Sequence, residues 1–353
     1  MATNPEADLQ VPGSSIAAKL SKIYLREIER IWRHLPVSFQ QNAAGIAFGR
    51  HIHRLVQEHA NRKQFFGTFF LRNRAELRAL CNLVKDRPTG AKVSIAVIAC
   101  SKGAEVYSIV WALQGCRPDL DVRVFAIDIS EEILEFASRG VYSLRSGDPD
   151  MNAGADANAT GQEIAFHTII DQNAPIFERV NSEELNALAD VRGDVAYIKD
   201  SLKHGIRWIQ GDALSEELPQ QIGTQEIVVA NKFLCHMSPE DAERCLKNVA
   251  RLIKPGGHIL VAGIDLEVRT KVAGQLQWKP VSEWTRELHD GDVSVRNGWP
   301  LQYWGLEPYG AVNQDPQLRY ASIFCVPGKR SDADLVDAGF QGNNNDTICS
   351  EAH

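Results

Sequence analysis

The chain has 353 residues, of which 44% are hydrophobic and 24% charged, and its net charge is −7. This composition excludes a collagen-like, a disordered or a small disulfide-stapled chain and indicates a globular protein. At roughly 150 residues per domain, the length predicts about two domains with a ligand cleft between them. No apolar run reaches the ~18 residues that a bilayer span needs, and residues 1–10 are polar. We therefore expect a cytoplasmic protein without a membrane partner.

The seven cysteines are odd in number and form no C-x-x-C pair. This spacing predicts reduced thiols, with neither a disulfide framework nor a zinc site, and no bound metal is expected.

The charge is unevenly distributed. Residues 1–92 hold 15 Lys+Arg and 7 Asp+Glu, a balance of +8, which leaves 23 against 38, or −15, for the rest. The basic segment 1–92 is either a set of solvated helix faces or a module that attracts an anionic substrate. Aromatic residues do not interleave with basic stripes, so no nucleic-acid partner is expected. The sequence leaves the oligomeric state unknown.

The first part of the chain has a helical pattern. Between residues 15 and 81, apolar side chains recur at three- and four-residue steps, which predicts three or four short helices. Pro88-Thr89-Gly90 interrupts the pattern. We predict a small all-α N-terminal domain over residues 1–90, basic and on the substrate side.

Buried strands then alternate with helices. Apolar or β-branched runs predict strands at 93–98, 122–127, 205–210, 226–230, 258–262 and 320–326. The helices between them begin near Gly103, after a capping Ser130, and at Ser238-Pro239. This alternation predicts an α/β domain over residues 91–340, with a mostly parallel sheet and helices on both faces.

Two segments depart from the alternation. Residues 140–205 are predicted to be an insertion, either a docking subdomain or a lid, and its small polar residues 148–158 indicate a mobile loop. Residues 341–353 are predicted to be a flexible tail.

Three turns follow successive strands where ligands bind in such sheets. The turn from Ala99 to Gly103 leads into a helix whose N-terminus can receive an anionic group. Asp128 ends the second strand, where a carboxylate can accept hydrogen bonds from two ribose hydroxyls. Asp212 follows the third strand and could meet an adenine amino group. Neither G-x-G-x-x-G nor a P-loop is present, so the pattern indicates a nucleoside site of another kind.

At these positions the chain resembles class I S-adenosylmethionine (SAM) methyltransferases, and within them the chemotaxis-receptor glutamate methyltransferase (CheR-type) group. That group's first loop typically reads STGEEPYS, and residues 101–108 here read SKGAEVYS. Residues 125–130 (FAIDIS), 139–142 (RGVY) and 252–257 (LIKPGG) are similar to its ATDID, RxGxY and LKPGG segments. Residues 68–70 (TFF) resemble the TxFFR that ends its helical N-terminal domain. The resemblance spans roughly residues 40–263.

The resemblance implies a Rossmann-like class I methyltransferase sheet, SAM as cofactor and S-adenosylhomocysteine as product. It implies that Glu105 holds the methionine amino group, Asp128 the ribose and Asp212 the adenine. The other residues expected to bind the cofactor are Ala99, Cys100, Ser101, Gly103, Ile129, Ala213 and Asn231.

The chain departs from the group's pattern on the acceptor side. Where the group reads RNxxIYF, residues 231–237 read NKFLCHM, so His236 replaces a tyrosine near the reacting methyl. Leu71 replaces the arginine after Phe-Phe, and Arg72 follows one place later. We predict that Arg72 positions a carboxylate acceptor, or that His236 serves as the base for an alcohol, phenol or amine. Tyr107, which the first loop keeps, completes the predicted catalytic set.

Five large aromatic residues lie within 27 positions of one another after the fifth strand. They are core residues, or they line an acceptor pocket or cage the cationic sulfonium. We expect two nearby charged residues, Asp265 and Arg269, to face the substrate. The five aromatic residues are Trp278, Trp284, Trp299, Tyr303 and Trp304.

The sequence therefore predicts a SAM-dependent methyltransferase that methylates a carboxylate of a small molecule or peptide, with an anionic acceptor. Two alternatives remain open. In the first, the amine of SAM attacks its own aminobutyryl chain, which expels methylthioadenosine and gives a four-membered-ring amino acid. In the second, the chain is a non-catalytic SAM-binding or partner-binding module.

Overall fold

A computed structural model of the protein describes residues 16–60, 62, 67–144, 176–310 and 316–328. The predicted mobile loop at 148–158 and the predicted tail at 341–353 lie outside these ranges. Within them, no helix is both long enough and apolar enough to cross a bilayer.

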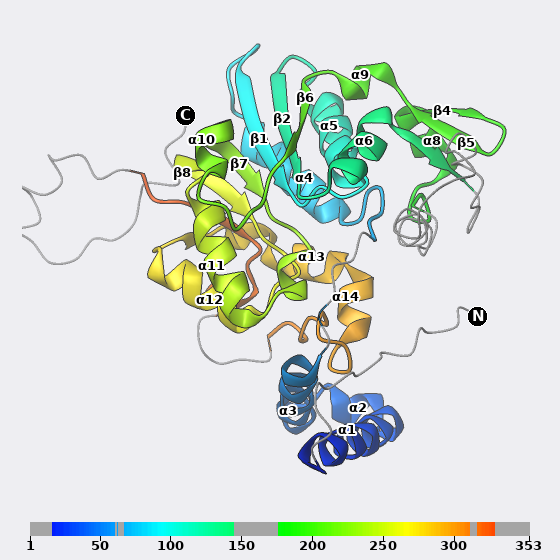
Figure 1. Ribbon diagram of the computed structural model, residues 1–353, viewed down its shortest axis with the longest axis vertical. Helices are drawn as coiled ribbons and strands as arrows, with labels where there is room; N and C mark the ends of the chain where they lie inside the picture. Colours follow the sequence, from blue (N-terminus) through cyan, green and yellow to red (C-terminus); the bar gives the residue numbers. More distant parts are fainter. Residues whose placement is uncertain (1–15, 61, 63–66, 145–175, 311–315, 329–353) are drawn as a thin grey trace, which may run out of the picture.

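A seven-stranded sheet forms the centre of the molecule and confirms the predicted α/β fold (Figure 1). The first five strands in spatial order pair in parallel, and the last two pair antiparallel. In spatial order they are β6 (Ile206–Gln210), β2 (Asp121–Asp128), β1 (Lys92–Ile98), β7 (Gln225–Val229), β8 (Ile253–Leu260), β10 (Ile323–Cys325) and β9 (Lys279–Pro280).

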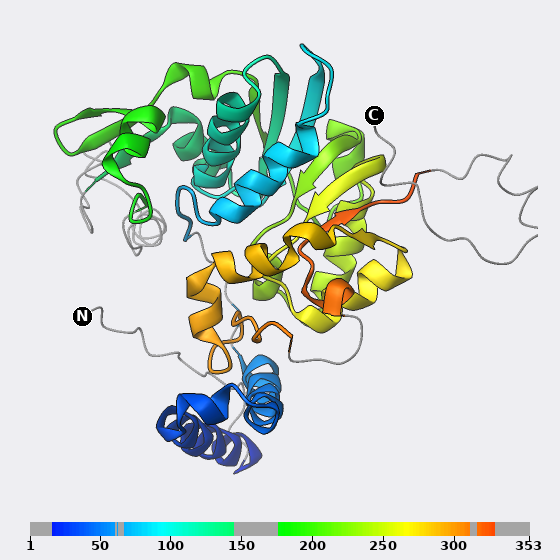
Figure 2. The same cartoon turned by 180° about the vertical axis from the view of Figure 1, so that it is seen from behind.

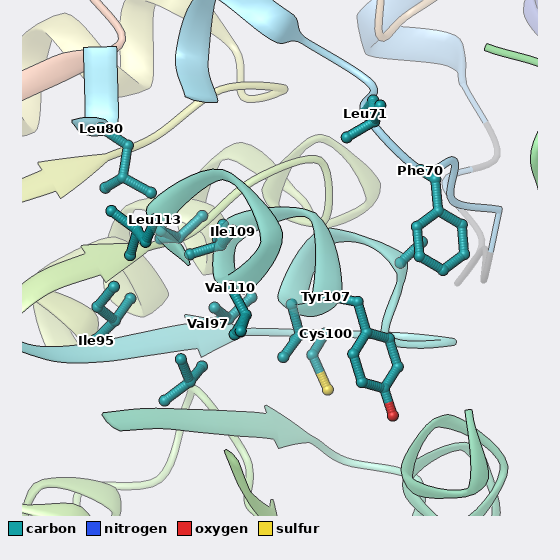
Figure 3. Packing of buried hydrophobic residues seen from close by; sticks show 14 of the residues in the cluster. Phe70, Leu71, Leu80, Ile95, Val97, Cys100, Tyr107, Ile109, Val110 and Leu113 are labelled. Carbon is teal, nitrogen blue, oxygen red and sulfur yellow. The ribbon is translucent and has the colours of Figure 1, made fainter. Parts of the chain in front are cut away.

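The sheet is apolar on both faces because helices cover both. In β1, Ile95 and Val97 pack on one side with α4 (Arg74–Val84) and α5 (Ala104–Cys116), as Figure 3 shows. Ala96 and Ile98 pack on the other side with α11 (Pro239–Ala250) and α12 (Leu266–Gln275). This two-residue alternation in a fully apolar strand is what a doubly covered sheet requires. The other helices of the sheet domain are α6 (Glu131–Arg139), α10 (Leu218–Ile222), α11 (Pro239–Ala250), α12 (Leu266–Gln275), α13 (Thr285–Gly291), α14 (Val293–Gly298) and α15 (Pro316–Tyr320), with 3₁₀ turns η2 (Leu234–His236) and η3 (Ser282–Trp284).

The helix starts that the sequence indicated are present. The side chain of Ser130 accepts a hydrogen bond from the Ile133 amide at the start of α6. The side chain of Ser238 accepts one from the Asp241 amide at the start of α11. Each satisfies one of the free amides of a first helical turn.

Three helices form a separate body at one end of the molecule (Figures 1 and 2). They are α1 (Ile16–His34), α2 (Val37–Gln40) and α3 (Ala43–His59). Their small core joins Trp32 and Ile52 to Trp299, whose ring lies 5.6 Å from that of Trp32 in a T-shaped pair. A Cβ at Gly49 would lie 2.2 Å from the Trp299 ring, so the close approach needs glycine there. The segment around Trp299 thereby connects the helical body to the sheet domain.

The fourth helix of the predicted N-terminal domain lies elsewhere. α4 packs along α5, and its Ala79, Leu80 and Val84 belong to the core of the sheet domain. Residues 67–84 therefore form part of the wall of the sheet rather than of the helical body, which affects the site described below.

The described part of the insertion is a small sheet of its own. Its strands follow the order β3 (Val141–Ser143), β5 (Val195–Ile198) and β4 (Ala189–Arg192), all antiparallel. Two short helices, α8 (Ser182–Leu188) and α9 (Asp200–Lys203), accompany it.

One expectation about the cysteines was wrong. Cys81 on α4 and Cys116 at the end of α5 form a disulfide, with their Cα atoms 6.3 Å apart. No local pattern indicates this pair, because the two residues are 35 positions apart and meet only through the packing of α4 on α5. Cys100, Cys235 and Cys245 are free and buried.

Candidate active site

A cavity of about 330 Å³, here called the cofactor pocket, lies at the carboxyl ends of β1, β2 and β7. The structure places nearly all the predicted cofactor residues on its walls, together with both Arg72 and His236. The predicted cofactor residues that line it are Ala99, Cys100, Ser101, Glu105, Asp128, Ile129, Asp212, Ala213 and Asn231.

The turn after β1 is sharp and lies against the end of β2. Ala99 and Ser101 both have positive φ angles, of 53° and 51°, which are uncommon for residues with a side chain. The amide of Ser101 donates to Asp128 Oδ2 at 2.8 Å, which fixes the turn against the end of β2. Strained backbone of this kind is common at active sites and ligand-binding sites.

Gly103 shapes this turn without lining the cofactor pocket. It precedes α5 with φ 82°, and a Cβ there would lie 3.0 Å from the Trp208 ring and 3.1 Å from the Ala137 Cβ. Gly103 was predicted to contact the cofactor, but it does not line the pocket. Instead, it allows the start of α5 to lie close to the pocket.

Asp128 lines the cofactor pocket at the end of β2. Its side chain is buried, and burial raises the pKa of its carboxyl. Oδ2 accepts from Ser101 and Oδ1 from the Ser130 amide at 3.2 Å. Each carboxylate oxygen can accept more than one hydrogen bond, so both can still receive a hydroxyl. Asp212 is exposed, and its Oδ1 accepts from the Leu214 amide at 2.8 Å at the other side of the pocket.

Two carboxyl groups meet at one amide nitrogen in the wall of the cofactor pocket. Asn231 Nδ2 donates to Glu105 Oε1 at 2.8 Å and to Glu76 Oε1 at 2.6 Å. Asn231 Oδ1 accepts from the Ala262 amide at 2.9 Å, which fixes the orientation of the side chain. Burial raises the pKa of both carboxyl groups, and that of Glu76 reaches about 8 because the charge of Glu105 adds to burial.

Glu76 was not identified from the sequence. It lies in the first turn of α4, where an acidic residue after the capping Asn73 is ordinary for a helix N-terminus. Only the packing of α4 on α5 brings it to the pocket, 155 positions away from its partner Asn231.

His236 lies where the cofactor pocket meets a second cavity, and it lines both. Its Nδ1 is 2.7 Å from the Tyr303 hydroxyl, and the two rings form a T-shaped pair. Burial and the nearby charges of Arg62 and Arg72 lower the pKa of His236 to about 4. The imidazole is therefore neutral at pH 7.

Arg62 fixes the turn that carries His236. Its guanidinium donates to the carbonyl oxygens of Cys235 and Met237, the two residues that flank His236, at 3.0 and 2.8 Å. It also donates to Asp265 Oδ2 at 2.9 Å and lies 5.5 Å from the centre of the Tyr303 ring. Sequence reasoning did not identify Arg62, because its partners are about 175 to 240 positions away in the chain.

Arg72 faces the cofactor pocket from the segment before α4. It donates to the Gly67 carbonyl at 3.0 Å, and its guanidinium lies 5.2 Å from the centre of the Phe69 ring. Among the described residues it has no carboxylate partner, and a guanidinium has five N–H donors. It can therefore still bind an anion.

Tyr107 does not line the cofactor pocket, contrary to the expectation from the loop motif. Its side chain is fully buried among the apolar residues of α5, and its hydroxyl donates to the Ala137 carbonyl at 2.7 Å (Figure 3). Burial raises the pKa of this phenol, so it stays protonated. We assign it a packing role that supports the turn after β1.

The second cavity has a volume of about 970 Å³ and lies beside the cofactor pocket. Its walls come from α3, Arg62, η2, the end of β8, α12, α13 and residues 303–307. Asp265 and Arg269 line it, but both already have partners: Asp265 is bound by Arg62, and Arg269 donates to the carbonyls of Val261 and Arg319.

The five aromatic residues divide between the two roles that the sequence left open. Tyr303 and Trp304 line the second cavity. Trp278 is buried in the core beside α12, Trp284 packs against the core on the α5 face, and Trp299 belongs to the helical body.

The residues of the cofactor pocket fit SAM. Two carboxyl groups could accept hydrogen bonds from an ammonium group, and a buried aspartate could accept them from ribose hydroxyls. The strained turn after β1 would let the backbone approach the ligand closely. When bound there, SAM would supply a methyl group on a sulfonium carbon.

Known protein families match the chain over the segments that form this pocket. A family described as CheR methyltransferase, SAM binding domain, matches residues 67–149, and one described as Methyltransferase domain matches residues 187–257. Chemotaxis protein methyltransferase 2 of Vibrio cholerae serotype O1 is 24% identical over 199 residues, which are 54% of this chain and 58% of that protein. The chain thus spans somewhat more than half the length of the curated relative it matches.

The solved structures to which the chain is similar share little sequence with it. An O-methyltransferase family protein from Burkholderia thailandensis has 10% identity and a TM-score of 0.33, over 92% of this chain and 76% of its own. The cyclase SpnF has 12% identity and a TM-score of 0.32, over 83% of this chain and 98% of its own.

Proposed function

We propose that this CheR-like, SAM-dependent methyltransferase transfers the methyl group of SAM to a carboxylate of a small molecule or peptide. Methyl transfer is a displacement at a sulfonium carbon, to which the protein contributes alignment and the exclusion of water. A carboxylate is already ionised at pH 7, so it needs a cation to position it rather than a base.

The position of Arg72 in the wall of the cofactor pocket is the main observation that supports this proposal. Arg72 lines the cofactor pocket without a carboxylate partner among the described residues, and it lowers the pKa of His236, which lies at the boundary with the second cavity. A guanidinium can hold a carboxylate with two parallel hydrogen bonds. Such an acceptor would direct an oxygen lone pair toward the methyl group.

The neutral state of His236 supports the same chemistry. A protonated imidazole at this position would repel the sulfonium, whereas burial and two arginines hold the ring neutral. Its ring lies against Tyr303, which lines the second cavity, so the remainder of the acceptor would lie there. The volume of that cavity, about 970 Å³, is at the upper end of the usual range for small-molecule sites.

A panel of carboxylic acids and short acidic peptides, incubated with SAM and assayed for S-adenosylhomocysteine and base-labile methyl esters, tests the proposal. With an accepted acid, Arg72→Met should lower kcat/KM about 100-fold, since charged hydrogen bonds contribute ~1.5–3 kcal/mol each. Arg72→Lys should restore only part of the loss because lysine lacks the planar fork.

The matched control is Arg123→Met, whose side chain is exposed near the start of β2, away from the pocket. It should leave the rate unchanged. Equal activity of Arg72→Met and Arg123→Met on every accepted acid would contradict the role given to Arg72. Tight SAM binding with no product across the panel would instead favour a non-catalytic module.

One observation favours a second candidate, the cyclisation of SAM itself. Glu76 places a carboxyl group of raised pKa beside the expected position of the ammonium. As a carboxylate, it could take a proton from that ammonium. The freed nitrogen lone pair would form a bond to the γ-carbon while the C–S pair leaves with sulfur, giving methylthioadenosine and a four-membered ring. Equal amounts of methylthioadenosine and the four-membered-ring amino acid, formed from SAM alone and without S-adenosylhomocysteine, would establish this reaction instead.

A further inference from the structure

We propose that Glu76 and Glu105 share one proton when the cofactor pocket is empty, and that the ammonium group of the cofactor displaces this proton on binding. Glu76 is then a second carboxyl group that recognises the amino-acid end of the cofactor. This inference rests on the SAM binding in the proposed function, whichever reaction follows.

The geometry forces the two carboxyl groups together. Both Oε1 atoms accept from the single Nδ2 of Asn231, at 2.6 and 2.8 Å. The amide cannot turn away, since its Oδ1 is held by the Ala262 amide. One carboxyl comes from α4 and the other from α5, and these helices are joined by the Cys81–Cys116 disulfide. The pair is therefore fixed by its surroundings.

Two carboxylates that accept from the same buried nitrogen repel each other, so one of them keeps its proton. Burial raises the pKa of each, and the charge of Glu105 raises that of Glu76 further. The facing cations are Lys232, which opposes both shifts, and Arg72, which favours ionised Glu105.

Lys232 does not neutralise the pair, and Arg72 opposes only the shift of Glu105. Lys232 Nζ is 3.0 Å from Asp292 Oδ2, so its charge is partly balanced there, and Asp292 itself raises the pKa of Glu76. The shared proton is therefore retained to a pH well above the usual range of glutamate.

An ammonium group reverses this balance. It brings a positive charge and three N–H donors, which both carboxylates can accept once they are ionised. Binding and deprotonation are thus linked: the ligand binds the doubly ionised pair, and protonation of the pair competes with it.

Calorimetric titration of S-adenosylhomocysteine in buffers of different ionisation enthalpy measures this linkage. At pH 7, binding should release close to one proton. Between pH 7 and pH 6, the affinity should fall about tenfold, because protons then compete for a group whose pKa is about 8. Methylthioadenosine, which lacks the amino-acid end, should bind without proton release and with no such pH dependence.

Glu76→Gln should abolish the proton release and weaken S-adenosylhomocysteine about tenfold while leaving methylthioadenosine affinity unchanged. Glu135→Gln, at an exposed position on α6, is the matched control and should behave as the wild type. Methylthioadenosine binding also reports whether the Glu76 variant is folded.

Three outcomes are distinct. Proton release with the expected pH dependence supports the inference. Binding of S-adenosylhomocysteine by the wild type without proton release, or with an affinity that Glu76→Gln does not change, overturns the inference and leaves the SAM site standing. Failure of the wild type to bind either nucleoside overturns the proposed function as well.

Discussion

The cofactor pocket and the second cavity share His236 but are built in different ways. The cofactor pocket is formed largely by four turns, each of which follows a strand of the parallel sheet, and residues 67–77 complete its wall. The second cavity is formed by residues of α3, η2, α12 and α13, by residues 303–307, and by Arg62. A pocket made of local turns is visible in the sequence, whereas a cavity made of distant segments depends on tertiary packing. The two should therefore respond differently to substitution.

The largest expected effect is on stability and concerns the second cavity. Arg62 and Asp265 form an ion pair in which both side chains are less than 10% exposed. Arg62→Met would leave the buried Asp265 carboxylate without its cation, so we expect the free energy of unfolding to fall by about 3 kcal/mol. Urea denaturation measures this change.

A double variant sharpens that prediction. Asp265→Asn removes the unpaired charge, so the double variant Arg62→Met with Asp265→Asn should regain part of the lost stability. If the single and double variants were equally unstable, the loss would come from the backbone bonds to Cys235 and Met237 rather than from the ion pair.

The next effect concerns the cofactor pocket alone. Glu105→Gln removes the charge that the ammonium group would meet, and we expect S-adenosylhomocysteine to bind about 100-fold more weakly, near the upper end for a charged hydrogen bond. The unfolding free energy should not fall, because a neutral amide at this position leaves a pair with at most one negative charge, as in the singly protonated wild type. An unchanged dissociation constant in calorimetry would contradict the predicted contact.

A smaller effect links the two regions. Tyr303→Phe removes the hydroxyl that lies 2.7 Å from His236 Nδ1, which should lower kcat about fivefold, in line with ~1 kcal/mol for one hydrogen bond. The affinity for S-adenosylhomocysteine should stay unchanged, since Tyr303 does not line the cofactor pocket. Parallel losses of affinity and rate would show that the two regions are not separable.

The smallest expected effect concerns pH: titration of His236 should not contribute to the pH dependence of kcat. The pKa of His236 is about 4, below the ordinary value for histidine, so the ring is neutral at pH 8 and stays neutral down to about pH 5. The difference in kcat between the wild type and His236→Asn should therefore be constant from about pH 8 to about pH 5.5. A difference that changes near the ordinary histidine pKa of about 6.5 would show that the ring titrates normally.

Sequence reasoning succeeded where neighbouring residues carry the information. Apolar runs such as residues 93–98 predicted the strands, and Asp128 at the end of β2 predicted a polar wall of the pocket. It failed for Tyr107, because a motif does not show which way a side chain points: this one turns into the core.

Contacts between residues far apart in the chain could not be predicted from the sequence. Glu76, Arg62 and the Cys81–Cys116 pair depend on partners 29 or more positions away, and none has a local signature. Because α4 was assigned to the helical domain, the sequence could not bring Glu76 to Glu105 on α5.

A crystal structure of the protein with S-adenosylhomocysteine bound tests the central claim most directly. We expect the ammonium group between Glu76 and Glu105, the ribose hydroxyls on Asp128, and the sulfur directed toward Arg72 and His236, open to the second cavity. A complex in which the ammonium meets neither glutamate and the sulfur points away from the second cavity would contradict this account.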